Sequence, residues 1–403
     1  MWCSAFDRWR WPVFMGLTAA VFVSVGGFAP AAAALDQDQW YLDAMKADLM
    51  WEVSTGEKIK VAVIDTGVDD SLPELKGRVL PGADLSHSPR DINDDDNGHG
   101  TQMASLIAGT GAGGGIQGVA PDAKILPIRP WNSKEDYAPK SMARAIRYAI
   151  DNGSKIINIS MRFDQGPGKY PELQSAVDHA LKNDVLVFAG TGNEGESGNA
   201  HSGIAATPGV VGIGAVDRNG RSAAWSTYGP EVALVAAGDE MPGRCPERRK
   251  FCMTSGTSNA TAIASGSAAL IWSKHPDWTS NQVLRVMMET AGKPKGKIPS
   301  KYLGYGSIRP AQVLLEGKGD PGPPDVNPLL AARESAKPTP ATSAPEGKNA
   351  DEPPNQPADR EDGEAETAGE AGRPAILWTA VGAVAAVAIA AAVLVMRVRR
   401  KSP

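Results

Sequence analysis

Apolar strand-like segments alternate with helix-like segments between residues 35 and 318. The strand-like segments include IKVAVIDTG (59–67), AKILPIRP (123–130), KIINIS (155–160), VLVFAG (185–190) and GVVGIGAV (209–216). Strands that are apolar throughout are typical of a parallel sheet buried on both faces, and the helices between them would cover those faces. The pattern predicts a three-layer α/β domain.

Two segments have the sequence of amphipathic helices. SMARAIRYAIDNG (141–153) has Ser141 as a plausible N-cap, Gly153 as a stop, and an apolar face made of Met142, Ala145, Ile146, Ala149 and Ile150. ELQSAVDHALKND (172–184) is the second. Functional side chains in such folds gather at the carboxyl ends of the strands. Three polar residues lie at or just beyond such ends: Asp65, Ser160 and Asn193.

The two ends of the chain have the sequence of export and membrane segments. Residues 1–34 carry Arg8 and Arg10, then an apolar run and small residues, which indicates a signal peptide cleaved near Ala34. Residues 375–396 contain no charge and are long enough to cross a bilayer, and the basic tail 397–403 would stay in the cytoplasm. The alternative for residues 1–34 is an uncleaved first membrane helix, and the alternative for residues 375–396 is a buried core helix. We expect a single-pass membrane protein with its folded domain outside the cell.

The segment between the domain and the predicted membrane helix is acidic. Residues 319–374 hold twelve Asp/Glu and five Lys/Arg, a net charge of −7, whereas the whole chain has −5. Rich in Pro, Ala and Glu and poor in aromatic residues, this segment is expected to be a disordered linker. The remainder of the chain is then near +2, and nothing in it indicates a nucleic-acid partner.

Cysteine usage fits an exported protein. Cys3 would leave with the signal peptide, which leaves Cys245 and Cys252 at the ends of CPERRKFC. In an oxidising compartment we expect them to form a disulfide, with two free thiols as the alternative.

The segment VAVIDTGVDD (61–70) places Asp65 where two unrelated classes of protease carry a catalytic carboxylate. In aspartic proteases two such carboxylates share a proton, and in the Ser-His-Asp triad one carboxylate orients a histidine. The first class needs a second Asp-Thr/Ser-Gly, which this sequence lacks. The second class needs a histidine and a serine downstream.

Both residues are present. His99 lies between glycines in DDDNGHGTQMASLIAGT (94–110), and Ser258 begins an apolar helix-like run in TSGTSNATAIASGSAALIW (254–272). A helix N-terminus favours the negative charge that develops in acyl transfer. Asn193, in FAGTGNEG (188–195), could donate a second hydrogen bond to that charge.

The motifs VAVIDTGVD, GHGT, GNEG and SGTS follow the order and spacing of the subtilisin-like serine peptidases, and the resemblance covers residues 40–316. It implies a subtilisin-like fold in which Asp65 orients His99, His99 is the base and Ser258 is the nucleophile. Asn193 and the Ser258 N–H would hold the oxyanion. It also assigns substrate binding to a further set of residues: Ser160, Met161, Arg162, Gly190 and Gly192.

The sequence departs from the family pattern at two places. The family usually continues its serine motif with Met-Ala-x-Pro, whereas Asn259 follows the serine here and Ala262 replaces the proline. Its substrate-binding strand usually reads Ser-Leu-Gly, whereas Arg162 stands in place of the glycine. We hypothesise that Arg162 shapes specificity, and the alternative is that it faces solvent.

The short segment before the domain, LDQDQWYLDAMKADLMWEVSTG (35–56), resembles that of mycosins, the membrane-anchored subtilases associated with type VII secretion. The resemblance implies protein substrates, a cell-membrane location and contact with the secretion machinery. A general cell-surface subtilase is the second interpretation. A protein that is mainly a scaffold, with weak or blocked peptidase activity, is a third.

No cofactor is expected. The run Asp94–Asp96 could bind calcium, but such runs are more often solvated loops. The other four histidines do not have the spacing of metal ligands. Because His99 must be neutral to accept a proton, activity should rise through about pH 6–7.

Overall fold

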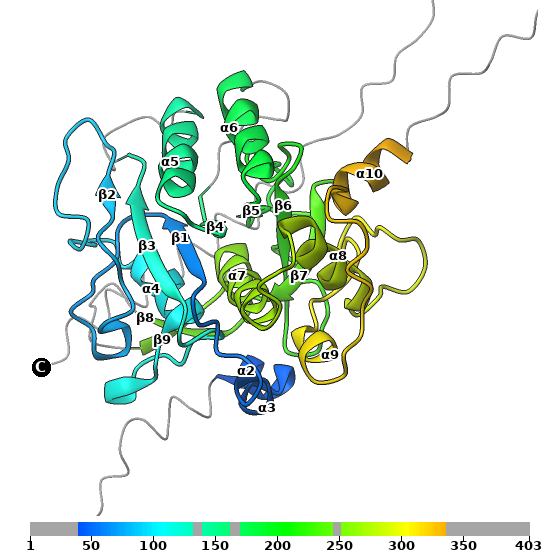
Figure 1. The fold of residues 1–403 in the computed structure, drawn as a ribbon, viewed down its shortest axis with the longest axis horizontal. Coiled ribbons are helices and arrows are strands. Elements are labelled where there is room, and N and C mark those ends of the chain that lie inside the picture. The colour runs from blue at the N-terminus through cyan, green and yellow to red at the C-terminus, as the bar shows by residue number, and fades with distance from the viewer. Residues whose placement is uncertain (1–38, 132–138, 162–169, 245–250, 336–403) are drawn as a thin grey trace, which may run out of the picture. The chain divides into compact units, whose positions relative to one another are not determined.

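The computed structural model describes residues 39–131, 139–161, 170–244 and 251–335 (Figure 1). Its central sheet has seven strands, all parallel, in the order β2-β3-β1-β4-β5-β6-β7. The strands are β1 Lys60–Ile64, β2 Ala83–Asp84, β3 Lys124–Arg129, β4 Ile156–Ile159, β5 Leu186–Gly190, β6 Val211–Val216 and β7 Val232–Ala237. The parallel sheet that the apolar segments predict is therefore confirmed.

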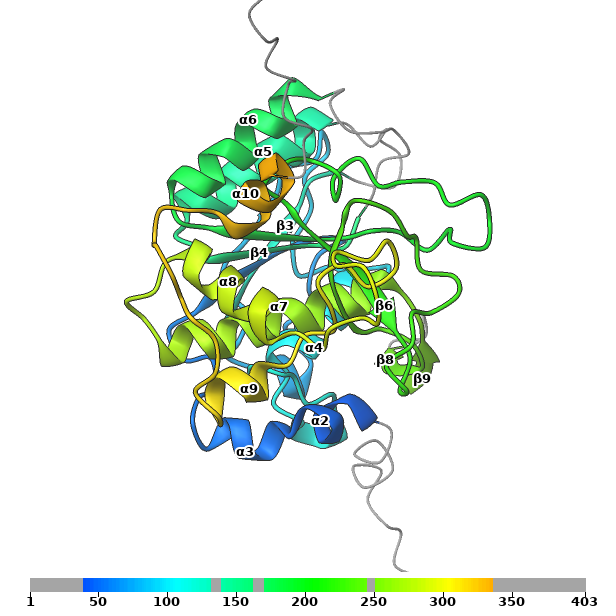
Figure 2. The same cartoon turned by 90° about the vertical axis from the view of Figure 1, so that its right-hand side faces the viewer.

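Helices cover both faces of this sheet (Figure 2). α5 and α6 pack on one face, and α4, α7 and α8 belong to the core on the other. Successive residues of β1 show why the strand is apolar throughout: Val61 and Val63 point into the core of α4 and α7, whereas Ala62 and Ile64 point into that of α5 and α6. The helices are α2 Trp40–Met45, α3 Ala47–Trp51, α4 His99–Ala108, α5 Pro139–Asp151, α6 Pro171–Lys182, α7 Thr257–Lys274, α8 Ser280–Thr290, α9 Pro310–Leu314 and α10 Pro328–Ser335, with short 3₁₀ turns η1 Pro73–Leu75 and η2 Ala112–Gly114.

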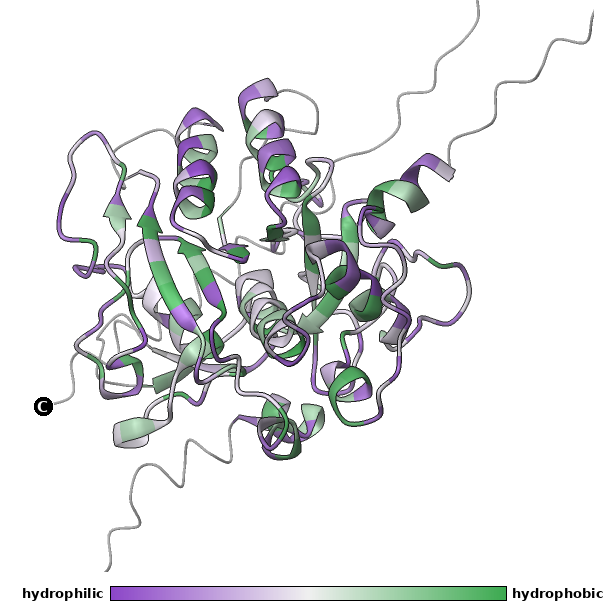
Figure 3. Ribbon diagram, in the orientation of Figure 1, coloured by the Kyte–Doolittle hydropathy of each residue, from purple (hydrophilic) through white to green (hydrophobic). Residues whose placement is uncertain are grey.

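Hydropathy follows these layers. Figure 3 shows apolar residues along β1 and β3, while polar residues alternate with apolar ones around α5 and α6. The apolar face predicted for α5 is buried at Met142, Ala145, Ile146 and Ala149. The prediction that Ser141 caps this helix is wrong: α5 already includes Pro139, and proline is well suited to a first helical turn because it has no N–H to leave unpaired.

α7 is the central helix of the domain. It packs against β4, β5, β6, β7 and α4 and is almost entirely buried. Its sequence is rich in Ala and Ser and contains one glycine, and these small residues let neighbouring backbones approach closely. A Cβ atom at Gly266 would lie 2.8 Å from the Val119 Cβ.

The segment before β1 is part of the folded domain. Tyr41 and Met50 are buried in the core of α4 and α7. Trp40 Nε1 donates to the Glu240 carbonyl at 3.1 Å, and Trp51 Nε1 donates to the Val119 carbonyl at 2.9 Å. The described part of this segment is therefore attached to the domain by both packing and hydrogen bonds.

Residues 319–335 correct the predicted linker boundary. They were expected to be disordered, yet they contain α10, whose Leu329 is buried. Backbone carbonyls before α10 accept hydrogen bonds from α8 and its cap, as in Gln282 Nε2 to Gly322 O at 3.0 Å and Thr279 Oγ1 to Pro324 O at 2.9 Å. The domain therefore extends to at least residue 335. The acidic, proline-rich composition of this segment favours disorder, but the buried Leu329 and these hydrogen bonds stabilise the folded segment.

A two-stranded antiparallel hairpin, β8 Met241–Arg244 and β9 Phe251–Thr254, was not predicted. It contains Cys252, but Cys245 lies outside the described residues, so the disulfide stays a prediction. The segments predicted as signal peptide (1–34), membrane helix (375–396) and basic tail (397–403), and the rest of the predicted linker, also lie outside them. Within the described ranges, no helix combines the length and the apolarity needed to cross a bilayer.

Candidate active site

Asp65 and His99 form the best-defined contact of the site. Asp65 directly follows β1 and is buried, and His99 is the first residue of α4. The His99 Nδ1 and Asp65 Oδ1 atoms are 2.7 Å apart, and the Thr66 N–H donates to the same oxygen at 2.8 Å. A carboxylate here fixes the ring and leaves Nε2 as the nitrogen that can exchange a proton. The sequence predicted this pairing.

The surroundings of His99 favour its charged form. Burial is the largest single influence and lowers the pKa of His99, but the charge and hydrogen bond of Asp65, with the charge of Asp95, outweigh it and raise the pKa above its usual value. The side chain is still 34% exposed, so the ring can meet a substrate. Because the neutral ring is the base, the rise in activity expected at about pH 6–7 moves to higher pH.

Asp95 holds the start of α4 in place. Its carboxylate accepts hydrogen bonds from Gly98 N at 3.0 Å, Thr101 N at 2.9 Å, Thr101 Oγ1 at 2.5 Å and Thr66 Oγ1 at 2.8 Å. It thereby joins the turn after β1 to the helix that carries His99. The expectation of a solvated loop is wrong for Asp95, which is 1% exposed, because four donors converge on it.

The glycine after His99 is required by a close approach of two backbones. A Cβ atom at Gly100 would lie 2.2 Å from the carbonyl oxygen of Gly67 and 3.0 Å from the Asp65 Cβ. The Gly100 N–H donates to Thr66 Oγ1 at 3.0 Å. The Gly-His-Gly motif thus lets α4 start directly against the turn that carries Asp65.

Ser258 is the second residue of α7. Its Oγ donates to the Ser160 carbonyl at 3.5 Å, and the Ser160 hydroxyl donates to the Ser258 carbonyl at 3.4 Å. Among the described residues, the hydrogen-bond partner of the Ser258 hydroxyl is therefore Ser160 and not His99. The two helices that carry His99 and Ser258 pack against each other.

Asn193 is held by the first residue of α7. Its Oδ1 accepts from Thr257 N at 2.9 Å and from Thr257 Oγ1 at 3.1 Å. With the oxygen occupied in this way, the amide nitrogen is the end that can donate to a ligand. The sequence did not predict the role of Thr257, although its place directly before Ser258 at a helix N-terminus is a usable signal.

Four of the five predicted substrate-binding residues lie at or just after the ends of β4 and β5, two strands that pack against α7. Gly190 ends β5, where a Cβ atom would lie 2.9 Å from Thr257 Oγ1, and Gly192 has φ +115° and donates its N–H to the same hydroxyl at 3.2 Å. Met161 follows Ser160 after β4 and packs partly buried against the core of α5 and α6. Arg162 lies outside the described residues. The structure thus places four of these five positions beside Ser258 or along the neighbouring strands.

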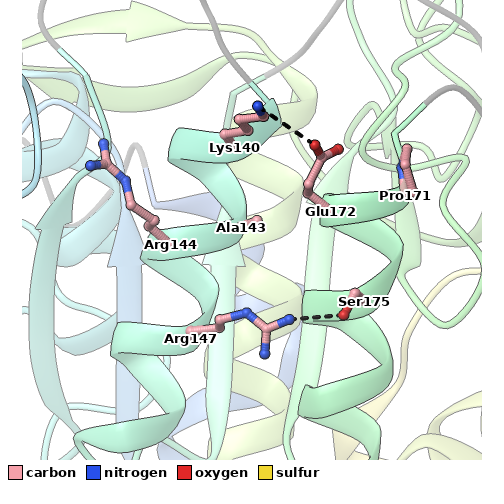
Figure 4. A pocket seen from close by; sticks show the side chains of 7 residues that line it. All are labelled: Lys140, Ala143, Arg144, Arg147, Pro171, Glu172 and Ser175. Carbon is pink, nitrogen blue, oxygen red and sulfur yellow. Dashed lines mark hydrogen bonds and ion pairs between the residues drawn. The ribbon is translucent and has the colours of Figure 1, made fainter.

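A separate pocket lies between α5 and α6. Figure 4 shows side chains of both helices facing each other across it, with Arg147 Nη2 donating to Ser175 Oγ at 2.9 Å and Lys140 Nζ 3.9 Å from Glu172 Oε1. None of the residues that line it belongs to the candidate site. For the ranges that the structure describes, no group of three or more His, Cys, Asp or Glu side chains is arranged to hold a metal ion.

Comparisons with known proteins identify a family and several similar structures. The family model described as Subtilase family matches residues 56–306. Subtilisin NAT from Bacillus subtilis subsp. natto is 36% identical over 256 residues, which are 63% of this chain and 65% of that protein. The chain thus spans somewhat less than two thirds of the length of this curated relative.

Two solved structures are similar in fold and sequence. MycP1, described as a serine protease and an essential component of the type VII (ESX-1) secretion system, has a TM-score of 0.59 and 28% identity, covering 68% of this chain and 88% of MycP1. The MycP3 protease from the type VII (ESX-3) secretion system has a TM-score of 0.58 and 29% identity, covering 68% of this chain and 87% of MycP3.

Proposed function

We propose that this chain, which belongs to the subtilase family, is a serine endopeptidase that cleaves protein substrates with Asp65, His99 and Ser258. The observation that carries the proposal is the 2.7 Å contact between Asp65 and His99, on a helix that packs against the one carrying Ser258. Family membership supports the same chemistry.

In this mechanism the Ser258 hydroxyl turns from the Ser160 carbonyl and attacks the scissile carbonyl, while His99 Nε2 takes its proton. Asp65 stabilises the imidazolium that forms. The Asn193 amide and the Ser258 N–H donate to the oxyanion. His99 returns the proton to the leaving amine, and water then hydrolyses the acyl-enzyme by the same steps in reverse order.

The cellular setting is a second part of the proposal. The similarity to MycP1 and MycP3 supports a role in type VII secretion. The sequence supports export by residues 1–34, an anchor at residues 375–396, and an extracytoplasmic domain in which a Cys245–Cys252 disulfide closes the short loop CPERRKFC. We expect the preference for the substrate side chain next to the cleaved bond to depend on Arg162. An Arg162→Gly variant with an unchanged cleavage preference in a peptide library would refute this.

The chemistry is tested with a fluorophosphonate probe on the full-length protein, exported and purified in detergent. Intact mass should show one label on the parent and none on Ser258→Ala, with both shown to be folded by circular dichroism. A folded parent that takes no label would refute an activated Ser258.

The cellular role needs a genetic comparison. Gene deletion and Ser258→Ala should both stop secretion of the substrates if cleavage is needed. If only deletion stops it, the protein acts first as a scaffold of the secretion machinery.

A further inference from the structure

Two buried amide side chains connect the helices that carry His99 and Ser258. Gln102 lies one turn after His99 on α4 and is 6% exposed, and Asn259 directly follows Ser258 on α7 and is 3% exposed. The Gln102 Nε2 donates to the Asn259 Oδ1 at 2.8 Å. Each catalytic helix thus holds the other through a residue close in sequence to its own candidate catalytic side chain.

The same two amides bind the end of the β8–β9 hairpin. Gln102 Nε2 also donates to Thr254 Oγ1 at 2.7 Å, and Asn259 Nδ2 donates to Thr254 Oγ1 at 3.1 Å and to the Thr254 carbonyl at 3.3 Å. Thr254 Oγ1 donates in turn to the Met241 carbonyl at 3.2 Å. The three side chains, which we call the amide clamp (Gln102, Thr254 and Asn259), form a closed set of hydrogen bonds between α4, α7 and the hairpin.

The hairpin fits closely against this set. A Cβ atom at Gly243, on β8, would lie 2.7 Å from Gln102 Oε1 and 2.6 Å from Thr254 Cγ2. The Gln102 side chain therefore packs directly on the backbone of the hairpin. A displacement of the hairpin would be transmitted to the helix that begins with His99.

Hydrogen bonds suit this place because they are directional, whereas apolar packing fixes orientation less strictly. The family pattern has methionine where Asn259 stands, and a methionine side chain could not donate the hydrogen bonds that Asn259 gives to Thr254. The Ser258 hydroxyl is bonded to Ser160 and not to His99. The relative placement of α4 and α7 therefore sets how far the hydroxyl must move to meet the ring.

We propose that Gln102 and Asn259 are positioning residues that fix α4 against α7, and through them hold the His99 ring in reach of Ser258. The proposal rests on the proposed peptidase function and deepens it. Neither side chain takes part in proton transfer. A misplacement of about 1 Å at the reacting groups can cost on the order of a hundredfold in rate.

The test uses the full-length protein with four variants. Gln102→Met and Asn259→Leu remove the hydrogen bond at similar volume. The double variant Gln102→Asn/Asn259→Gln exchanges the two residues, so that both amides and the total number of side-chain methylene groups are kept. Ser267→Ala is the matched control, because Ser267 is also buried on α7 but its hydroxyl donates only to Ile263 of the same helix.

For a peptide substrate, kcat of Gln102→Met and of Asn259→Leu should fall about ten- to a hundredfold while KM changes less than about threefold. The exchanged pair should recover at least about tenfold over the poorer single variant, and Ser267→Ala should match the parent. If both single variants keep kcat within about twofold, or the exchanged pair recovers nothing, the clamp is not what positions the triad.

A second measurement does not need catalysis. The chain has five histidines, so ¹⁵N-histidine NMR can identify the His99 ring signals by their loss in His99→Ala. These signals should move or broaden in Gln102→Met and stay in place in Ser267→Ala. Unchanged signals in Gln102→Met would overturn the proposal. If the parent takes no fluorophosphonate label, the peptidase function fails on that result, and the NMR comparison still decides the clamp.

Discussion

Replacing Asp95 with alanine should lower the melting temperature of the domain by about 6–9 °C, although its neighbours Asp94 and Asp96 are exposed. Its carboxylate accepts from two backbone N–H groups and two hydroxyls in a place closed to solvent. Alanine leaves all of these donors without their acceptor. The hydroxyls can turn toward other partners, but the N–H groups cannot.

The magnitude follows from the cost of unpaired buried donors. Each costs about 1–3 kcal/mol, so the two N–H groups at about 1.5 kcal/mol each give about 3 kcal/mol. For a domain of this size, about 1 kcal/mol shifts the melting temperature by about 2–3 °C. Asp95→Asn should have a smaller effect, because its carbonyl oxygen still accepts while its amide group faces donors.

The neighbouring residue provides the control. Asp96 is 64% exposed and pairs with Arg90 at 2.6 Å. Exposed ion pairs contribute little to stability, so Asp96→Ala should change the melting temperature by less than about 3 °C.

Thermal unfolding followed by circular dichroism at one scan rate compares the two variants with the parent. If Asp95→Ala melts within about 2 °C of Asp96→Ala, the four hydrogen bonds do not hold the start of α4, and the acidic run is a solvated loop after all. Labelling of Ser258 by the fluorophosphonate, measured well below the melting temperature, should slow in Asp95→Ala only.

Three further results are expected. Asp65→Asn should shift the rise of kcat/KM to lower pH than in the parent, because burial, which lowers the pKa of His99, is then opposed by less negative charge; an unmoved pH profile would contradict this. Asn193→Ala should reduce kcat by about 10²–10³ with KM nearly constant. If KM rises by that factor and kcat stays constant, the Asn193 amide binds the substrate before the reaction and not the oxyanion. Gly100→Ala should abolish labelling in a destabilised protein, because its Cβ would lie 2.2 Å from a backbone oxygen, and a parent-like labelling rate would show that the turn can move aside.

Short-range patterns predicted the sheet and the position of Asp65 at the end of a strand, whereas the pairing of Asp65 with His99, 34 positions away, was implied by the resemblance to the subtilisin-like peptidases. A run such as VAVI has to be buried on both faces, and a polar residue directly after it has to lie at the strand's carboxyl end. That reasoning needs no knowledge of distant contacts.

The amide clamp and the role of Asp95 could not be predicted, because their partners come from separate parts of the chain. Gln102 and Asn259 are 157 positions apart in the sequence, and nothing in the pattern near either one indicates a buried polar partner. Asp94, Asp95 and Asp96 form one acidic run in the sequence, and only the fold decides which of the three carboxylates faces the donors.

α10 was missed for a related reason. Composition averages over a segment, and the residues around it are acidic and rich in proline. Leu329 is buried because α8 offers a surface for it, and that surface exists only in the folded domain.

The place of α7 in the chain bears on when the protein can fold. This helix covers one face of β4–β7, yet it is synthesised after all of these strands. A nascent chain that ends before residue 257 has no partner for that face, and pairings between distant segments form slowly in any case. Ser258 is made with the helix that completes the core, so we expect an unfinished chain to have neither a stable domain nor a nucleophile.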